Sequence, residues 1–161
     1  MKNVDKVVLE FGRFIVANCG YYFSKINDIK KVNEANYIIL DGGIHQVNYY
    51  GQIMGMKKPF MKIINKNLEI INVEHQNDSN EKWQVCGSLC TLNDILVKDI
   101  IVKEPQIGNI FIFENTGAYS VTEGMSLFLS RELPAIYIIN QNKDLICVRE
   151  KTETYFLNGG L

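Results

Sequence analysis

The 161-residue sequence has almost no net charge and no long apolar run, and each shortage excludes a class of protein. Its 17 basic residues balance 18 acidic ones to a formal charge of −1, so it lacks the electrostatic footprint of a nucleic-acid binder. No apolar stretch reaches the roughly 20 residues that cross a bilayer. The cationic start, Met1–Lys6, leads into no signal-peptide core. We therefore expect no nucleic-acid and no membrane partner.

Histidine is scarce, and the four cysteines follow no metal or disulfide pattern. Cys86 and Cys90 are four residues apart, but no second Cys or His pair has matching spacing, so no metal site is expected. His45 and His75 lie far apart in the sequence, which favours surface or core histidines over ligands. Reduced thiols in a cytoplasmic protein are the simplest interpretation.

What the sequence does contain is ordinary globular composition, with 47% apolar and 22% charged residues. No linker or repeat divides residues 1–161, so we expect one domain. Short apolar runs between turn signals predict strands. These runs are Val7–Leu9, Tyr37–Leu40, Phe60–Ile64, Leu68–Val73, Lys82–Cys86, Asn109–Phe113, Ala135–Asn140 and Asp144–Arg149.

Helical signals are few. Phe14–Cys19 predicts a short helix that ends at Gly20, where a positive φ is cheap. Thr152–Leu157 predicts a closing helical turn. The sequence therefore predicts a mainly β fold with short helices, a closed or sandwiched antiparallel β domain.

Three short segments carry candidate chemistry. In Glu10–Arg13, a glycine after a predicted strand lets backbone N–H groups approach a phosphate, and an arginine adds a fixed positive fork. Tyr119, on a Gly-Ala turn, has a hydroxyl that can donate a hydrogen bond to an anion. The alternative for Glu10–Arg13 is a surface ion pair after a strand, and the alternative for Tyr119 is a side chain that anchors a loop.

The third segment is Gly87–Asp94, which places Cys90 in a polar, turn-prone setting. A cysteine in such a place can act as an acid or nucleophile, because its pKa can be tuned toward neutrality. The alternative, a small buried hydrophobe, is what we expect of Cys19, Cys86 and Cys147 in their apolar runs.

Together these segments resemble the C-terminal half of pyridoxal-phosphate decarboxylases of the ornithine/diaminopimelate/arginine type. The family's motifs Glu-Pro-Gly-Arg, Asp-Gly-Gly, Gly-Pro-x-Cys-x-x-x-Asp, Gly-Ala-Tyr and Arg-x-x-Pro-Ala match, in order, Glu10–Arg13, Asp41–Gly43, Gly87–Asp94, Gly117–Tyr119 and Arg131–Ala135. The resemblance implies the antiparallel β-barrel (Greek-key) domain of alanine-racemase-like enzymes. Residues 1–20 would be the remnant of the last strand of a preceding barrel and a short helix.

The resemblance also implies how a complete enzyme holds pyridoxal 5'-phosphate. Glu10 would pair with the pyridine nitrogen and keep it protonated. Gly12 and Arg13 would hold the cofactor phosphate, helped by the hydroxyl of Tyr119.

Three further residues would serve the substrate in that enzyme. Cys90 would reach across a homodimer interface and assist protonation of the carbon that loses CO₂. Thr91 and Asp94 would lie at the substrate, with no chemical step assigned to Asp94. In the best-known members an acidic residue follows the cysteine and binds a distal ammonium, a contact that Thr91 cannot provide. Thr91 therefore argues against ornithine, lysine or diaminopimelate as the substrate.

Other positions depart from the family pattern. Phe11 and Ser88 stand where the motifs have proline, which should loosen both turns. Gly42–Gln46, Tyr50–Gln52 and Met56-Lys57 look like the subgroup that acts on carrier-protein-linked amino acids, which adds an acyl-carrier protein as a candidate partner.

The largest departure is the (β/α)₈ barrel, which takes roughly 250 residues. None of the 14 lysines lies where the family has its cofactor-binding lysine. We therefore expect the chain to be inactive without a barrel half, to associate weakly by itself and to leave Val7–Leu9 without its barrel neighbours. Cys90, Thr91, Asp94 and Tyr119 should lie along one rim. The alternative is a non-catalytic regulatory or binding homologue.

Overall fold

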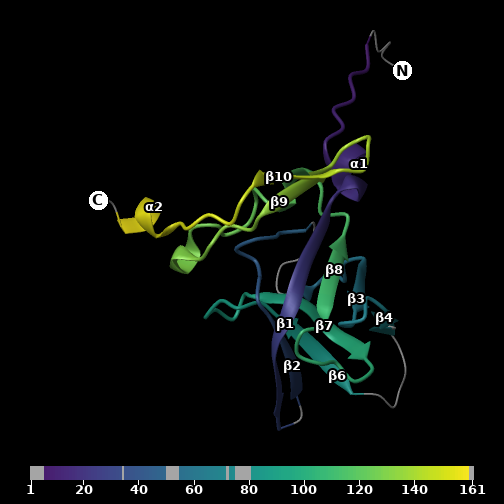
Figure 1. The fold of residues 1–161 in the computed structure, drawn as a ribbon, viewed down its shortest axis with the longest axis vertical. Helices are drawn as coiled ribbons and strands as arrows, with labels where there is room; N and C mark the ends of the chain where they lie inside the picture. The colour runs from purple at the N-terminus through teal and green to yellow at the C-terminus, as the bar shows by residue number, and fades with distance from the viewer. Residues whose placement is uncertain (1–5, 34, 50–54, 72, 75–80, 160–161) are drawn as a thin grey trace, which may run out of the picture.

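The computed structural model describes residues 6–33, 35–49, 55–71, 73–74 and 81–159. Most of the ordered elements are strands, arranged in a main sheet with the order β4-β3-β8-β1-β2-β6-β7-β5 and a separate two-stranded sheet, β10-β9 (Figure 1). The mainly β fold with few short helices expected from the sequence is confirmed. None of the described helices is long and apolar enough to cross a membrane.

A single strand, β1 (Tyr21–Val32), joins the two halves of the main sheet. Its first half pairs antiparallel with β8 (Ile110–Glu114), and its second half pairs antiparallel with β2 (Ala35–Leu40). The register shifts between Ile26 and Asp28, and a bulge of this kind bends a strand. The bend lets one strand belong to both halves, so that the sheet surrounds a core.

The remaining strands extend each half. On one side, β3 (Met61–Ile64) pairs with β8 and carries β4 (Ile70–Ile71). On the other, β6 (Lys82–Cys86) pairs with β2 and with β7 (Ile95–Val102), which carries β5 (Val73–Glu74). The β2–β6 pair is parallel, so the sheet is mixed rather than wholly antiparallel. A parallel pair needs a long crossover, and residues 41–81 provide it.

The core lies inside this sheet. Its largest fully buried side chains are aromatic and aliphatic residues from both halves: Ile26, Ile38, Leu40, Ile63, Leu96, Ile100, Phe111 and Phe113. Phe111 and Phe113 lie in β8, and their rings stack with centroids 6.0 Å apart. Because β1 supplies Ile26 and β2 supplies Ile38, one continuous cluster stabilises both halves.

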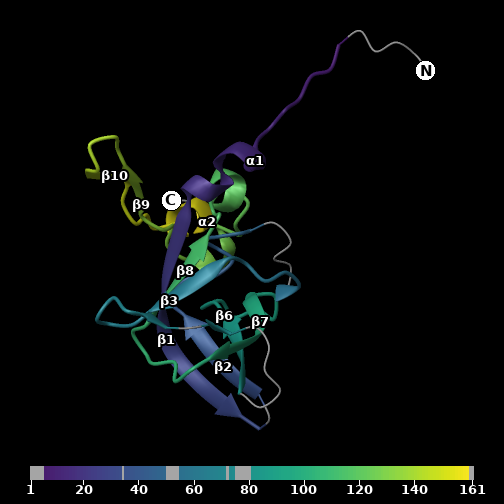
Figure 2. The same ribbon diagram turned by 90° about the vertical axis from the view of Figure 1, so that its right-hand side faces the viewer.

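The other elements lie outside the main sheet. β9 (Ile136–Ile139) and β10 (Leu145–Arg149) form a hairpin beyond it, and residues 6–12, before α1 (Arg13–Val16), extend away from it (Figures 1 and 2). Short helical segments complete the chain: η1 (Ala17–Cys19), η3 (Ala118–Ser120), η4 (Phe128–Ser130) and α2 (Tyr155–Gly159).

Two local expectations need correction. Val7–Leu9 forms no strand, and these side chains are 65% to 73% exposed, so the segment is extended and unpaired. The helix expected at Phe14–Cys19 is present as α1 and η1, but Gly20 has φ −108°. Glycine is needed there because a Cβ would lie 2.1 Å from the backbone nitrogen of Gly117, not because of a positive φ.

Candidate functional site

Tyr119 lies far from Gly12 and Arg13 in the sequence but forms one cluster with them, which we call the Arg13 corner. A Cβ on Gly12 would lie 2.1 Å from the Tyr119 hydroxyl oxygen, so only glycine permits this contact. The Arg13 guanidinium carbon lies 5.4 Å from the centroid of the Tyr119 ring, a cation–π arrangement. Arg13 also donates a hydrogen bond from Nη2 to Oε2 of Glu123, at 3.2 Å.

Backbone contacts hold this corner against the end of β8. The Gly117 N–H donates to the carbonyl of Ala17 at 2.9 Å, and the Thr116 N–H donates to the carbonyl of Gly20 at 3.0 Å. A Cβ on Gly117 would lie 1.9 Å from the carbonyl oxygen of Val16. The two chain segments can approach this closely only because glycines face each other. Glu10 lies just before the corner in the exposed, extended segment.

Cys90 is exposed on the loop between β6 and β7, which we call the Cys90 loop (Gly87–Asp94). The buried carboxylate of Asp94 holds the loop through hydrogen bonds to two backbone N–H groups. Its Oδ1 accepts the Ile44 N–H at 2.9 Å and its Oδ2 accepts the Leu89 N–H at 2.8 Å. Burial, to 2% exposure, raises the pKa of Asp94, and these two donors and Arg131 act in the opposite direction.

The glycines of two motifs make room for this carboxylate. A Cβ on Gly43 or on Gly87 would lie 2.6 or 2.3 Å from the Asp94 oxygens. The Asp94 N–H in turn donates to the Thr91 carbonyl at 3.2 Å. The structure therefore brings Cys90, Thr91 and Asp94 into one loop. Its geometry makes Asp94 a support for two loops, and its contact with substrate stays a prediction.

The segment 41–49 connects the Cys90 loop to the Arg13 corner. Ile44 binds Asp94, as described above, and the Asn48 N–H donates to the carbonyl of Ser120 in η3 at 2.7 Å. Tyr119 therefore belongs to a separate cluster that shares a support with Cys90. Thr91 and Asp94 share the Cys90 loop, and the expected common rim with Tyr119 stays a prediction.

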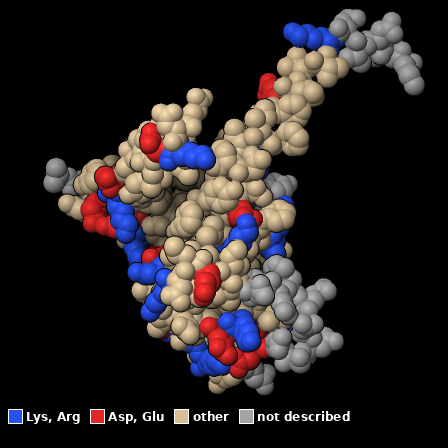
Figure 3. Space-filling view, turned by 45° about the vertical axis from the view of Figure 1, so that its right-hand side comes forward, with Lys and Arg blue, Asp and Glu red and all other residues tan. Residues whose placement is uncertain are grey.

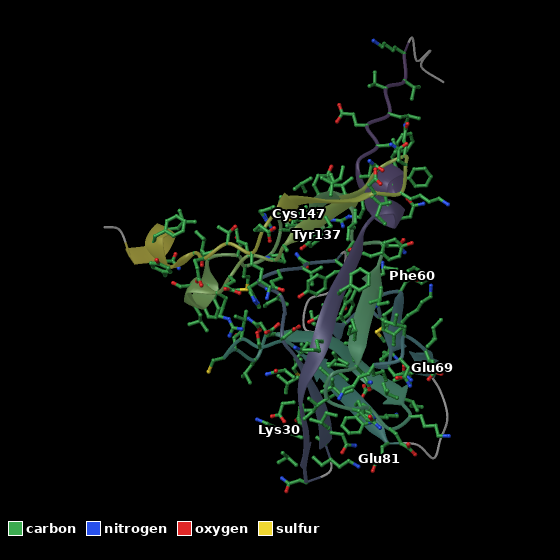
Figure 4. All side chains as sticks on the ribbon, viewed as in Figure 1. Lys30, Phe60, Glu69, Glu81, Tyr137 and Cys147 are labelled. Carbon is green, nitrogen blue, oxygen red and sulfur yellow. The ribbon has the colours of Figure 1, made fainter. Side chains whose placement is uncertain are left out.

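The other three cysteines were expected to be buried, and the structure shows this in part for Cys86 alone. All four cysteines lie among the described residues and are free thiols. Cys86 is half-buried, and burial raises its pKa to about 11. Cys19 and Cys147, expected as buried hydrophobes, are exposed, because their apolar neighbours belong to elements outside the core. Figure 4 places Cys147 on the β9–β10 hairpin beside Tyr137.

A comparison with known protein families decides what these clusters belong to. The model for the C-terminal sheet domain of pyridoxal-dependent decarboxylases matches residues 13–117. The chain belongs to this family. Among the described residues of this decarboxylase sheet domain, no three His, Cys, Asp or Glu side chains group closely enough to hold a metal ion.

Curated relatives of the sheet domain are decarboxylases. A 2-[(L-alanin-3-ylcarbamoyl)methyl]-2-hydroxybutanedioate decarboxylase of Staphylococcus aureus is 30% identical over 145 residues, which cover 89% of this chain and 36% of that protein. A diaminopimelate decarboxylase of Buchnera aphidicola is 29% identical, covering 91% and 35%. An L-glutamyl-[acyl-carrier protein] decarboxylase of Niallia circulans is 28% identical, covering 89% and 33%. The chain thus spans about a third of the length of these relatives.

Solved structures share the fold of the sheet domain. A crystal structure of a diaminopimelate decarboxylase matches with a TM-score of 0.72 at 18% identity, covering 91% of this chain and 34% of that one. The enzyme from M. jannaschii, in complex with L-lysine, matches with a TM-score of 0.66 at 21% identity, covering 87% and 29%. Both confirm the architecture of the C-terminal domain.

The family is pyridoxal-dependent, and the Arg13 corner fits the phosphate end of that cofactor. The Gly12 backbone lies against the Tyr119 hydroxyl, and Arg13 supplies a guanidinium that also pairs with Glu123. An amide, a guanidinium and a hydroxyl in one place are the donors that phosphate takes in proteins.

Arg131 and His45, to which the motifs give no role, belong to a polar network beside the Cys90 loop. Arg131 donates from Nη2 to the hydroxyl of Ser88 at 3.0 Å, a contact that no spacing rule predicts. His45 is 1% exposed, and its Nδ1 is a buried atom with no hydrogen-bond partner within the described residues. Burial first, and then the charge of Arg131, lowers the pKa of His45 to about 4. His45 is therefore a neutral core histidine at pH 7.

Proposed function

We propose that this chain is the C-terminal part of a pyridoxal-phosphate-dependent amino-acid decarboxylase and acts together with a (β/α)₈ barrel half. The observation that carries the proposal is the shared framework of two clusters. The Arg13 corner, with its phosphate donors, and the exposed thiol of Cys90 both rest on the segment 41–49. A domain that served only as a structural support has no need of both.

Bound pyridoxal phosphate supplies an electron sink that lets an amino acid lose CO₂. The residues of this chain would bind the cofactor and supply protons to it and to the substrate. Gly12, Arg13 and the Tyr119 hydroxyl hold the phosphate, and the carboxylate of Glu10 keeps the pyridine nitrogen protonated. Cys90, exposed in the middle of its loop, would project into the site of a second subunit in a homodimer and donate a proton to the carbon that has lost CO₂.

Exposed apolar side chains outside the main sheet support docking with a barrel half. Ile139, Leu145 and Phe14 are 70%, 66% and 85% exposed. Figure 3 shows residues 6–12 projecting from the body of the molecule, with apolar side chains between Lys6 and Glu10. A two-stranded hairpin such as β9–β10 is only marginally stable in water by itself, and its apolar faces call for a covering surface.

The chemistry of the Cys90 loop bears on the substrate and the compartment. Thr91 is neutral, so an amino acid with a free distal ammonium lacks its charged partner here, and an amino acid linked to a carrier or to a larger acid is favoured. The Niallia circulans relative, whose name specifies a carrier-protein substrate, supports an acyl-carrier protein as a partner. Four free thiols support a reducing, cytoplasmic location.

The test is complementation. The chain is co-expressed with the preceding, unmatched portion of the Staphylococcus aureus relative, and the purified complex is assayed for CO₂ release and for the absorbance of bound cofactor. Activity is expected in the complex and in neither part alone, with the substrate of that relative preferred over diaminopimelate. A non-catalytic homologue gives a complex without CO₂ release, and that result overturns the proposal.

Cys90→Ala tests the role of the thiol within that complex. We expect turnover to fall by about 10²–10⁴, the usual contribution of a general acid, with cofactor binding retained. Cys147→Ala is the matched control, because Cys147 is equally a free, exposed thiol but lies on the hairpin. If both variants keep full specific activity per folded molecule, Cys90 is not the acid.

A further inference from the structure

The Cys90 loop contains a serine where the family motif has a proline. We propose that Ser88 and Arg131 form a clamp that takes over the stiffening role of the proline, and that Arg131 is the positioning residue for Cys90. The naming of Cys90 as the reacting group rests on the proposed function, whereas the clamp stands on the geometry of this chain alone.

Ser88 forms four hydrogen bonds with three residues. Arg131 donates from Nη1 to the Ser88 carbonyl at 3.4 Å and from Nη2 to the Ser88 hydroxyl oxygen at 3.0 Å. The hydroxyl donates in turn to the Asp41 carbonyl at 3.1 Å, and the Ser88 N–H donates to the Gly42 carbonyl at 2.8 Å. A proline could make only the first of these four contacts, since it has neither an N–H nor a hydroxyl. The loosening expected of Ser88 is therefore offset by specific bonds.

The clamp reaches Cys90 through one residue. Leu89 is 8% exposed, and its N–H is bound by the carboxylate of Asp94 at 2.8 Å. The two residues before Cys90 are thus fixed by Arg131 and by Asp94, while Cys90 itself is exposed. Fixing the backbone on one side of a turn restricts the directions in which the next side chain can point, which is how a reacting group is preorganised.

Arg131 is itself anchored to the C-terminal segment. Its carbonyl accepts the hydroxyl hydrogen of Thr154 at 2.9 Å, and Thr154 is fully buried at 0% exposure. The Leu133 N–H also donates to the Thr152 carbonyl at 2.8 Å. The segment that carries the hairpin therefore connects through Arg131 to the Cys90 loop.

Amide hydrogen exchange of the intact chain tests the clamp. Arg131→Met removes both donors while keeping a side chain of similar length, and we expect the exchange of the Leu89 amide to accelerate about tenfold or more, since a hydrogen bond to a charged group contributes at least that to an opening equilibrium. Arg149→Met is the matched control, because Arg149 donates to the Pro134 carbonyl at 3.2 and 2.9 Å, away from the loop. This substitution should leave the exchange rate of the Leu89 amide unchanged.

Two further variants distinguish a clamp from a general loss of stability. Arg131→Lys, which keeps the charge but cannot bind Ser88 as a fork, should give an intermediate acceleration. Ser88→Ala should accelerate Leu89 exchange in the wild-type chain and add less beside Arg131→Met than it does alone, because both substitutions remove the bond between Arg131 and the Ser88 hydroxyl. Equal acceleration at Leu89 and at the core amide of Ile63, or strict additivity of the two substitutions, overturns the clamp.

The same variants in the complemented enzyme separate the two proposals. If the clamp positions Cys90, Arg131→Met lowers kcat with KM nearly unchanged, and Arg131→Lys restores part of it. A complex that shows the exchange effect without any decarboxylation contradicts the proposed function and supports the clamp. Decarboxylation with no exchange effect at Leu89 supports the proposed function and contradicts the clamp.

Discussion

The main sheet and the elements outside it have similarly apolar strands but opposite surroundings. In β8, Phe111 and Phe113 are fully buried, and in β2 so is Ile38. In the β9–β10 hairpin, Ile139 and Leu145 are 70% and 66% exposed. The difference shows that the buried core of the chain lies in the main sheet, whereas the apolar side chains of the hairpin face outward. Under the proposed function, stability and docking belong to different parts of one chain.

The sharpest test of this contrast compares Phe111→Ala with Ile139→Ala in the isolated chain. Removing a fully buried phenylalanine side chain should lower the free energy of unfolding by about 3–5 kcal/mol, from lost burial and the cavity left behind. Truncating exposed Ile139 should change it by less than about 0.5 kcal/mol. Urea unfolding measures both. A cost at Ile139 close to that at Phe111 would break the distinction between core and interface.

A pH titration of stability examines the polar network under the Cys90 loop. The pKa of His45 is lowered to about 4 in the fold, so the unfolded chain binds the proton first as the pH falls. Stability should therefore be complete above about pH 6.5 and decrease toward pH 4, by as much as about 3 kcal/mol. Buried Asp94, with its raised pKa, contributes the opposite trend at the acidic end.

Subtracting a variant isolates the histidine. His45→Gln removes the titrating group and should flatten the decrease between pH 6.5 and 4, as followed by the urea midpoint at each pH. Asp94 is present in both proteins, so its contribution cancels in the difference. An unchanged slope in His45→Gln would show that another group causes the loss.

The smallest effect concerns thiol chemistry and leaves stability untouched. Burial raises the pKa of Cys86, in core strand β6, to about 11 from an ordinary 9.0, so its thiolate fraction near pH 8 is about a hundredfold below that of an ordinary thiol. Iodoacetamide should therefore label exposed Cys90 and Cys19 well before Cys86, as followed by peptide mass spectrometry. Simultaneous labelling would show that the sheet opens at this edge.

Most strands follow from the sequence wherever a short apolar run is bounded by turn residues. Lys82–Cys86 forms β6 with those bounds, and Ala135–Asn140 and Asp144–Arg149 contain β9 and β10. Phe60–Ile64 contains β3, whereas Leu68–Val73 is divided between β4 and β5. These segments are local patterns that need no distant partner to be recognised.

Two long strands were missed because their sequences interrupt the apolar pattern. β1 contains Asn27-Asp28 and Lys30-Lys31 at the place where it changes partner, and its second half is half-buried or exposed. β7 contains Lys98-Asp99, and Asp99 has a positive φ of 53° within the strand. Bends that let a strand follow two neighbours replace regular alternation with polar residues, so periodicity fails where the topology is decided.

For the site, the motif order singled out candidate residues, and their roles stay predictions. Gly12, Arg13 and Tyr119 lie together because two glycines bring their segments into contact. Val7–Leu9 looks like a strand in sequence and is none here, since a strand needs a neighbouring strand to pair with. Arg131 and His45 act through long-range packing that a single sequence does not encode in any spacing.

The divided pairing of β1 also sets an order of assembly for the molecule. Its second half pairs with β2, which follows it closely in the sequence. Its first half pairs with β8, so that Tyr21 lies opposite Glu114, about ninety residues further along the chain. Closing a long loop is slower than forming a hairpin, so the β1–β8 ladder is a late step in folding. Tyr119 follows β8 directly and Gly12 precedes β1. The Arg13 corner is therefore completed only when the long-range β1–β8 ladder closes.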